Sequence, residues 1–475
     1  MFATLIFISG AQAAESLVTT PTSASSNLIA NHTPGDSLQL IAARKKKRLK
    51  KKVKSKPKTT ATAPTTTTPE TLPTDLTQTT PPPVPPAPPV PPAPAEVAPP
   101  APVAPPVEAP KAPVEAPKAE APNQFSTTTK LQGQVIFGAT GSVGGDFSRN
   151  TAFGARSRLE LKTDIGGGTL TTRLQAIGLG SSNQNPTAGN APTPEGNLSW
   201  TDGTTTTNSI GVDALKYEFA LSPQTQVVVA ANAGASDDFT DTINPYFDGD
   251  GASGSISAFG NRPSIYYTVQ GAGVGIRHQL SDSTELSVGY LSSTSGSPAV
   301  GSGLFGGSYG ALAQLTFKTG GNSKVGVTYT RTLNANPTTG STNANPAVAG
   351  NSNNFGLQGS FQLSPEFALG GWAGYTQNQA AGGDRQIWNW AVTAAAPDLG
   401  GKGNLAGFLV GQEPRVASSN NGTTDAKSGL HIEGFYQMKI NDSLSITPGL
   451  IYLTAPNQQP GNSAVIGALR STFSF

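Results

Sequence analysis

The sequence predicts an all-β fold: a closed, antiparallel transmembrane barrel of sixteen strands, preceded by a disordered Lys-rich and Pro-rich N-terminal extension. Two observations carry this prediction. From Phe125 onward, apolar and polar residues alternate with a period of two in segments of about ten residues, as membrane barrels require. The chain also has no run of about 18 apolar residues, so a membrane protein of this sequence must close its strands into a barrel.

Composition narrows the possible functions. Of the 475 residues, 36% are apolar and only 13% are charged, which is well below the roughly 25% of a usual soluble chain. Cysteine is absent, so the sequence excludes a disulfide framework, thiolate catalysis and a cysteine-ligated metal.

The N-terminus resembles a secretory leader. An apolar run from Phe2 to Ile8 is followed by Ala11, Gln12 and Ala13, which predicts a signal peptide over residues 1–13. The run lacks the basic residues that usually precede it. We therefore expect the true start of the signal peptide to lie further upstream. The alternative is an apolar N-terminus that is not cleaved.

Residues 14–58 are predicted to be disordered and contain a strongly basic block. Behind a secretory signal, this block argues against nucleic acid and favours an anionic cell-wall polymer or peptidoglycan as its partner. The alternative is a solvated run of charges without a specific partner. The residues expected to form the cell-wall tether are Arg44, Lys45, Lys46, Lys47, Arg48, Lys50, Lys51 and Lys52.

Residues 59–123 form a Thr-rich and then Pro-rich linker. Proline fixes φ and removes backbone donors, so this segment cannot pack a core and should adopt polyproline II. At about 3.1 Å per residue, the part from residue 81 onward would span on the order of 130 Å, enough for a stiff spacer in the periplasm. The barrel domain is predicted to occupy residues 124–475.

Short turns and longer loops alternate between the predicted strands, which is the pattern of membrane barrels. An even number of strands places both ends of the barrel on the periplasmic side. The predicted strands are residues 130–138, 151–163, 168–178, 210–222, 225–235, 267–280, 283–293, 309–317, 323–331, 353–363, 366–376, 386–396, 403–412, 429–438, 443–453 and 465–475.

One loop, residues 236–263, is unusually long and acidic. A loop of this length in a compact domain is usually functional or disordered. We expect it to fold into the lumen and narrow a water-filled pore, facing arginines on the opposite wall. Its acidic residues are Asp237, Asp238, Asp241, Asp248 and Asp250.

The alternation places a group of basic side chains on the inner face of the wall. A basic wall facing an acidic loop would set a transverse field across a narrow aperture and tune ion selectivity. The alternative is that the basic residues pair with Glu160, Glu218 and Glu285 and serve stability. The predicted wall residues are Arg156, Arg158, Arg173, Lys216 and Arg277.

Two glycine-rich motifs invite other interpretations. Gly271, Gly273 and Gly275 resemble a dinucleotide fingerprint but lie within a strand, so we expect them to face the lumen and leave room for the loop. The DGDG motif at residues 248–251 resembles a calcium loop, but Phe259 stands where an EF-hand needs its last carboxylate. A weak divalent-cation site remains open.

No catalytic or cofactor motif stands out. The histidines, His32, His278 and His431, are scattered and do not form a zinc or iron set. The sequence therefore predicts no cofactor, no metal centre and no enzymatic activity.

The chain ends in STFSF. A last strand that closes on an aromatic residue is typical of the signal read by the outer-membrane assembly machinery. We expect Phe473 and Phe475 to carry it. The alternative is a coincidental aromatic terminus.

The barrel region resembles a known family. FSTTTKLQGQVIFGATGSVGGD at Phe125–Asp146 is similar to the opening of cyanobacterial outer-membrane porins related to the OprB carbohydrate-selective porins, often labelled iron uptake porins. SRLELKTDI, DTINPYFDGDGASGSISAFGNRPSIYY, ELSVGYL and GLFGGSYGALAQLTFK continue the resemblance. It implies a homotrimer of sixteen-stranded barrels in outer-membrane lipid. Small solutes, namely sugars and inorganic ions including iron, would cross it by passive diffusion.

The N-terminal extension departs from that family. Most relatives carry an S-layer-homology domain and a coiled coil, where this chain has the basic block and the Pro-rich linker. We expect these to attach the barrel to the cell wall by bulk charge. A structural anchor with incidental conduction is the second hypothesis. A ligand-gated iron-complex transporter is a third, but it needs a plug domain that the polar extension cannot form.

Overall fold

The computed structural model describes residues 126–145, 147, 150–180, 193–201, 208–461 and 463–475. The predicted signal peptide, basic segment with its cell-wall tether, and Pro-rich linker lie outside the described residues, so these remain predictions. Among the described residues, no helix combines the length and the apolar composition needed to cross a bilayer.

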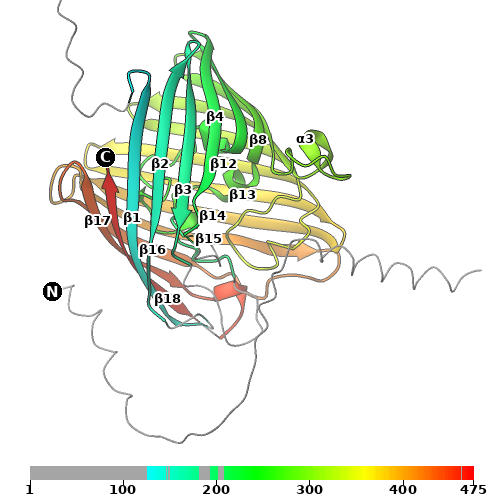
Figure 1. Ribbon diagram of the computed structural model, residues 1–475. Helices are drawn as coiled ribbons and strands as arrows, with labels where there is room; N and C mark the ends of the chain where they lie inside the picture. The colour runs from blue at the N-terminus through cyan, green and yellow to red at the C-terminus, as the bar shows by residue number, and fades with distance from the viewer. Residues whose placement is uncertain (1–125, 146, 148–149, 181–192, 202–207, 462) are drawn as a thin grey trace, which may run out of the picture. The chain divides into compact units, whose positions relative to one another are not determined.

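Sixteen antiparallel strands close into a barrel (Figure 1). Consecutive strands pair, except that β5 pairs with β8, and β1 closes the barrel against β18. The predicted fold is confirmed, since each predicted range overlaps one wall strand. The wall strands are β1 (Thr129–Gly144), β2 (Ala152–Ile165), β3 (Gly168–Ile177), β4 (Gly211–Ser222), β5 (Thr225–Ala235), β8 (Gln270–Ser281), β9 (Thr284–Ser292), β10 (Tyr309–Gly320), β11 (Ser323–Leu333), β12 (Asn351–Ser364), β13 (Phe367–Ala380), β14 (Gly383–Pro397), β15 (Leu405–Ser419), β16 (His431–Lys439), β17 (Leu444–Leu453) and β18 (Ala464–Ser474).

Strand ends follow the sequence pattern less closely than strand positions do. β5 begins and ends where it was predicted, but β15 runs to Ser419 although its alternation stops at residue 412. Glu413 and Pro414 interrupt that alternation. Glu413 is nevertheless buried in the barrel, because loop backbone N–H groups from Gly196 and Gly340 bind its carboxylate. Contacts with distant loops therefore extend this strand.

Side chains alternate between two environments along the strands. On the inner face, Arg158 of β2 lies opposite Gln134 of β1 and Gln175 of β3. On the outer face, Phe153 is 74% exposed, and the rings of Phe137 and Phe473 meet edge to face with centroids 5.8 Å apart. This apolar outside and polar inside is what a bilayer requires of a barrel wall.

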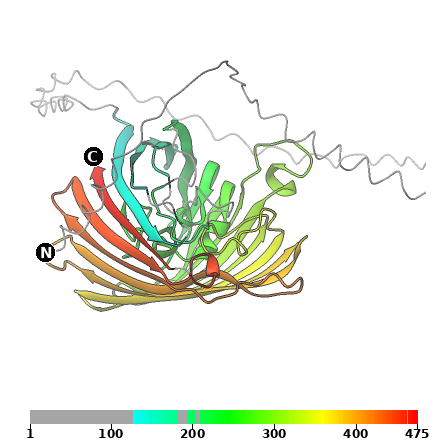
Figure 2. The ribbon, with the colours of Figure 1, turned by 90° about the horizontal axis from the view of Figure 1, so that it is seen from below.

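The connection between β5 and β8, here called the inner loop (residues 236–269), lies inside the barrel. It contains η1 (Ser236–Asp238), β6 (Asp248–Gly249), β7 (Ser253–Gly254), α2 (Ala258–Asn261) and η2 (Ser264–Thr268). Thr472 of β18 donates a hydrogen bond to the Ala252 carbonyl (2.7 Å), and Tyr266 donates to Gln314 Oε1 of β10 (2.7 Å). Figure 2 shows green loop segments within the curve of the orange and yellow strands. Two other connections carry α3 (Gly303–Gly306) and η3 (Pro456–Gln458).

The inner loop packs against the inner faces of β13 to β18, which we call the packed wall. Loop and wall share one buried apolar cluster, in which the Phe259 ring meets Trp372 (5.4 Å) and the Phe247 ring meets Phe435 (5.3 Å). Other members of the cluster include Ala252 and Ile256 from the loop and Ala391, Ala395, Leu409, Ile451, Ile466 and Ala468 from the wall. This side of the lumen is therefore filled with protein.

Glycines on β8 and β9 admit a ring from the base of the inner loop. A Cβ atom at Gly275 would lie 2.1 Å from the Phe239 ring, and one at Gly289 would lie 2.3 Å from it. The prediction that a β8 glycine faces the lumen and makes room for the loop is thus confirmed at Gly275. At Gly271 and Gly273, added Cβ atoms would instead meet the backbone of β9 and its end.

Candidate functional site

The candidate site begins at the tip of the inner loop, a tight turn between β6 and β7. Ala252 N donates to the Gly249 carbonyl (2.9 Å), and the two residues between them have positive φ, 50° at Asp250 and 80° at Gly251. This is the sign pattern of a type I′ turn, for which Asp-Gly is a favoured pair. The DG at residues 250–251 that resembles part of a calcium loop therefore forms a turn.

Asp250 meets the arginines of the barrel wall. Its carboxylate accepts a short hydrogen bond from Arg158 and lies 3.6 Å from Arg173 Nη1, while its carbonyl accepts from Arg156 Nη2 (3.0 Å). Burial alone would raise the pKa of Asp250, but Arg158 and its neighbours outweigh burial and hold that pKa below its usual range. The carboxylate is therefore charged at neutral pH.

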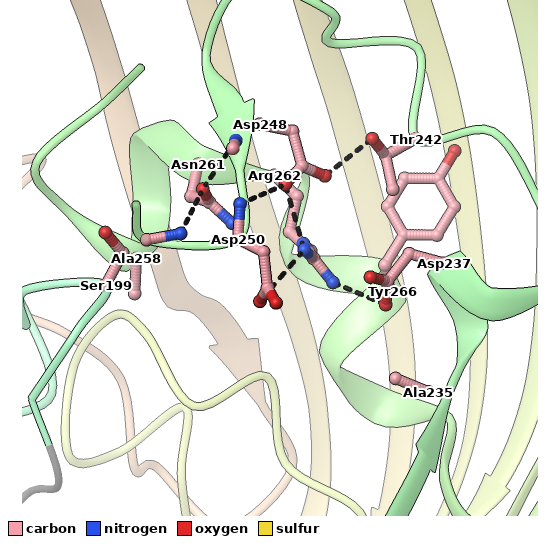
Figure 3. A network of polar contacts seen from close by, with 12 residues as sticks. Ser199, Ala235, Asp237, Thr242, Asp248, Asp250, Ala258, Asn261, Arg262 and Tyr266 are labelled. Carbon is pink, nitrogen blue, oxygen red and sulfur yellow. Dashed lines mark hydrogen bonds and ion pairs between the residues drawn. The ribbon is translucent and has the colours of Figure 1, made fainter. Parts of the chain in front are cut away.

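A loop arginine gathers the acidic residues on the other side of the tip (Figure 3). Arg262 lies 2.5 Å from Asp237 Oδ1, 2.9 Å from Asp248 Oδ1 and 3.8 Å from Asp250 Oδ1. Asn261 Oδ1 accepts from the backbone N–H groups of residues 249 and 251. In the sequence, Arg262 only marked the end of the acidic stretch, and nothing indicated that it would fold back among its own aspartates.

Arginine side chains bind the two aspartates of the DGDG motif, Asp248 and Asp250, which were considered as ligands of a divalent cation. Asp248 is bound by Arg262 and accepts a hydrogen bond from Thr242 (2.7 Å), and Asp250 is bound by wall arginines. Among the described residues, no group of three or more acidic or histidine side chains is placed to hold a metal ion.

Asp213 of β4 also belongs to the site, although its position in the alternation predicts an outward side chain. It lies 2.5 Å from Arg173 Nε and accepts a hydrogen bond from Gln175 (2.9 Å). The register of β3 and β4 shifts at this point, so that Asp213 is an extra residue beside Ala214. Such a bulge reverses the side-chain parity, which explains why reasoning from strict alternation missed this carboxylate.

The remaining predicted wall residues divide into three arrangements. Lys216 forms a short ion pair with Asp238 of the inner loop. Arg277 lies 3.4 Å from Glu285 of the neighbouring strand, which is the ladder pairing considered as the alternative. Arg156 is only 2% exposed and bonds to the loop backbone. The last predicted acidic residue, Asp241, pairs with Lys324 of β11.

Three cavities follow one another along the inner faces of β2, β3 and β4, which we call the open wall. The first, of about 620 Å³, is lined by Arg173, Asp213 and Asp237 among others, and the second, of about 450 Å³, by Gln134. Arg158 and Asp250 line both. Glu160 lines the second cavity and a third of about 580 Å³. The Arg158–Asp250 pair thus stands between two cavities that are each large enough for many water molecules.

The charges around the first cavity are nearly balanced, with three arginines and four aspartates, and they are paired. Arg158, Arg173 and Arg262 line it together with Asp213, Asp237, Asp238 and Asp250. The sequence suggested an acidic loop and a basic wall on opposite sides of a gap, but at Asp250 the two are in direct contact. Because each guanidinium lies within 4 Å of a carboxylate, the field felt by a passing ion is weaker than separated charges would give.

A second loop covers the inner loop, and the sequence analysis did not anticipate it. Within the connection from β3 to β4, Ser199 N donates to the Ile256 carbonyl (3.0 Å), and Ala258 N donates to the Asn197 carbonyl (2.7 Å). Leu198 and Trp200 are almost fully buried in the same apolar cluster. In the sequence, the motif LSW at residues 198–200 stands in an otherwise polar loop. This motif was the signal from which the contact could have been predicted.

Buried acidic residues of the packed wall hold the loops in place. Glu433 accepts from Ile256 N (2.7 Å) and Ser255 Oγ (2.7 Å). His431 lies between Glu433 (3.3 Å) and Glu413 (2.7 Å), and Glu413 in turn binds backbone N–H groups of two further loops. His431 therefore belongs to a structural network of hydrogen bonds. The alternation of apolar and polar residues alone could not have predicted this role.

Phe473 lies on the outer face of β18, and Phe475 directly follows that strand. Phe473 is 37% exposed, and Phe475 exchanges two backbone hydrogen bonds with Gly133 of β1 (2.7 and 3.0 Å). Their role as an assembly signal stays a prediction.

The barrel region is similar to known proteins. Residues 118–475 match the family described as carbohydrate-selective porin, OprB family. The uncharacterized protein alr4550 of Nostoc sp. (strain PCC 7120 / SAG 25.82 / UTEX 2576) is 33% identical over 416 residues, which are 80% of this chain and 70% of that protein. The uncharacterized protein sll0772 of Synechocystis sp. (strain ATCC 27184 / PCC 6803 / Kazusa) is 32% identical over 392 residues, 74% of this chain and 70% of that protein.

The fold also resembles a solved structure. The high-pH structure of OprB from Pseudomonas putida superposes with a TM-score of 0.51 at 10% sequence identity, covering 73% of this chain and 94% of that one. At this level of identity the likeness concerns the barrel alone.

Proposed function

This chain belongs to the OprB family of carbohydrate-selective porins of the outer membrane, and we propose that it lets small hydrophilic solutes cross that membrane by passive diffusion. Members of this family are channels without enzymatic chemistry. The solutes proposed for this chain are sugars and inorganic ions, including iron.

The observation that carries the proposal is the row of cavities along the open wall. Because Arg158 and Asp250 line both the 620 Å³ and the 450 Å³ cavity, a solute moving from one to the other passes this pair. We propose that it forms the eyelet of the pore, with Arg173, Asp213 and Arg262 beside it. Polar groups of a pore lining replace part of the hydration shell of the solute.

The balanced charge at this eyelet favours uncharged, hydroxyl-rich solutes over strong selection between anions and cations. Paired arginine and aspartate side chains offer donors and acceptors side by side, which suits the adjacent hydroxyl groups of a sugar. A free excess of one sign would instead concentrate the opposite ion.

Two measurements test this function. Planar bilayers with the purified protein should show stepwise conductance with a small reversal potential in a salt gradient, and proteoliposomes should swell in neutral sugars below a size limit. Bilayers that stay silent would contradict the proposal. They would favour the alternative, a structural anchor whose loss detaches the outer membrane from the cell wall. Deletion of residues 15–123 separates the two, since a porin keeps its conductance without them.

We further propose that the protein is a homotrimer and that its basic segment, in the periplasm, binds an anionic cell-wall polymer. A peptide of residues 44–58 should sediment with isolated sacculi at low salt and be released at high salt, because salt screens exposed charges. Retention at high salt would contradict a purely electrostatic tether. Conductance steps that occur in threes, or a trimer in native mass spectrometry, would support the oligomer, and a lone barrel would refute it.

A further inference from the structure

The tip of the inner loop is held by an arginine that lines none of the three cavities. Arg470 of β18 donates from Nη1 to the carbonyls of Gly251 (3.0 Å) and Ser255 (3.0 Å), and from Nη2 to the carbonyl of Gly254 (2.8 Å). Its side chain is completely buried. One guanidinium thus binds three carbonyls, one in the turn that carries Asp250 and two in the segment that follows it.

The surroundings of Arg470 fix the direction of its side chain. The guanidinium carbon lies 5.0 Å from the centre of the Trp200 ring, in a cation–π contact with the second loop. Two residues further along β18, Thr472 donates to the Ala252 carbonyl (2.7 Å). The planar fork of arginine can reach several carbonyls at once, which the single ammonium of lysine cannot reproduce with the same geometry.

Arg156 holds the same turn from the other side. Its Nη2 donates to the Asp250 carbonyl (3.0 Å) and to Gln134 Oε1 of β1 (2.9 Å). Arg156 and Arg470 therefore bind the backbone of the tip, whereas Arg158 and Arg173 meet the Asp250 carboxylate. Around Asp250, the wall therefore has arginines of two kinds, those that bind the loop backbone and those that bind the carboxylate.

We propose that Arg470 is a positioning residue of the pore: by binding the three carbonyls it fixes where Asp250 stands opposite Arg158, and so sets the aperture without touching the solute. Asp250 occupies a φ of 50° in this turn, a value that the Asp-Gly pair of a type I′ turn favours. Without Arg470, the turn and the segment after it lose three charged hydrogen bonds, and Asp250 can move away from the wall. This inference rests on the function proposed above.

The first test compares single channels of Arg470→Gln, Arg470→Lys and the unchanged protein in planar bilayers. We expect Arg470→Gln to increase the open-channel current noise by a factor of about two or more, because a released loop segment fluctuates. The mean conductance should rise as well, and Arg470→Lys should restore part of the quiet state. Arg385→Gln is the matched control, since Arg385 also donates to a loop carbonyl, but in a different loop, at Asn343 (3.3 Å).

Heat-modifiable electrophoretic mobility checks that each variant forms a closed barrel. A silent unchanged protein would refute the proposed function itself. If the unchanged protein conducts and Arg470→Gln gives the same noise and conductance, the positioning role is refuted. A change of equal size in Arg385→Gln would also overturn it, since the effect would then be general loosening.

A cross-link separates position from charge. The chain contains no cysteine, so Ala252→Cys and Thr472→Cys introduce the only thiols, at two residues already in contact. In the Arg470→Gln background, a short bis-methanethiosulfonate bridge between them should return the noise and conductance to the unchanged level, and reduction should reverse this. If the bridged channel stays noisy, Arg470 acts through its charge, and the proposal fails.

Discussion

The packed wall and the open wall belong to the same barrel but use their inner faces in opposite ways. The packed wall presents apolar side chains such as Trp372, Leu409 and Ile451, and the inner loop lies on them as on the core of a soluble protein. The open wall presents Arg158, Arg173 and other charged residues to cavities. The comparison teaches that the width of this lumen depends on which strands the loop covers.

The difference has a simple energetic basis. Burial of apolar side chains gives about 25 cal/mol per Å² and has no preferred direction, so it can hold a whole loop in place. Charged pairs at a wet surface give about 0–1 kcal/mol each, so they stabilise little, and we propose that those of the open wall act on solutes instead. Changes on the packed wall should therefore alter loop stability, and changes on the open wall should alter selectivity.

The largest effect is expected from Phe259→Ala, at a residue of the inner loop that packs on the packed wall. Phe259 is 1% exposed and contacts Trp372, and removing such a ring costs about 3–5 kcal/mol in buried sites. Hydrogen exchange of residues 236–269 should speed up strongly. Phe305→Ala is the control, since Phe305 is 79% exposed. Unchanged exchange in Phe259→Ala would show that the apolar cluster does not hold the loop.

A pH-dependent change should follow at Glu195, in the second loop. Burial, and then the nearby charge of Glu413, raise the pKa of Glu195 to about 8, and Asn457 N (2.5 Å) and Gln458 Nε2 (2.8 Å) donate to it. A carboxyl with a raised folded-state pKa favours folding when protonated, so loop protection is highest below the unfolded pKa, about 4.3. It should fall as pH rises through about 8.

Glu195→Gln tests that pH dependence. The amide cannot ionise, so hydrogen exchange of residues 193–201 should lose its rise in rate between pH 5 and 9, after correction for intrinsic exchange. A variant that keeps the same pH profile would assign the titration to another group.

On the open wall, Arg156→Ala combined with Arg158→Ala should shift ion selectivity towards cations and enlarge the conductance. Asp250 would lose its nearest positive partner, and Asp213 would lose the more distant of its two arginines, Arg158, whose Nε lies 3.9 Å from its carboxylate. A unit charge at 4 Å in water is worth about 1 kcal/mol, so the permeability ratio should change by up to about fivefold. Reversal potentials in a salt gradient measure this. Arg158→Ala alone is the second variant to measure. It keeps Arg156, which binds the loop backbone, and so isolates the effect of Arg158. An unchanged reversal potential in both variants would show that Arg158 is not part of the eyelet.

The smallest effect is expected from Arg277→Ala. Arg277 pairs with Glu285 within the wall and lines none of the three cavities described above. A partly exposed pair of this kind contributes about 1 kcal/mol or less. Conductance and reversal potential should stay near the unchanged values. A large shift in either quantity would show that the open wall extends to β8.

The strand pattern could be predicted from sequence because lipid imposes it directly. Each wall residue faces either lipid or lumen, so alternation reveals the sixteen strands and the inward arginines. Asp213 could not be predicted, because a bulge changes the parity of one residue without any mark in the alternation. Arg262 was missed for another reason: its partners lie 12 to 25 positions away within an irregular loop, where no period applies.

Some features of the inner loop could be predicted from the sequence, and others could not. Its length and its aspartates were visible in the sequence, and so was the glycine at residue 275 that receives Phe239. Its docking on the packed wall depends on Glu433, Arg470 and Trp372, three residues on separate strands. Only the closed barrel brings these together, so no local pattern could reveal them.

The last strand, β18, contributes both to the closure of the barrel and to the contacts of the inner loop. β18 carries Phe473 on its outer surface, closes the ring against β1 and brings Arg470 to the turn around Asp250. A nascent chain whose final strand has not yet been inserted therefore has neither a complete seam nor a fixed gap for solutes. The role proposed for Arg470 would thus couple biogenesis and permeability through this one strand.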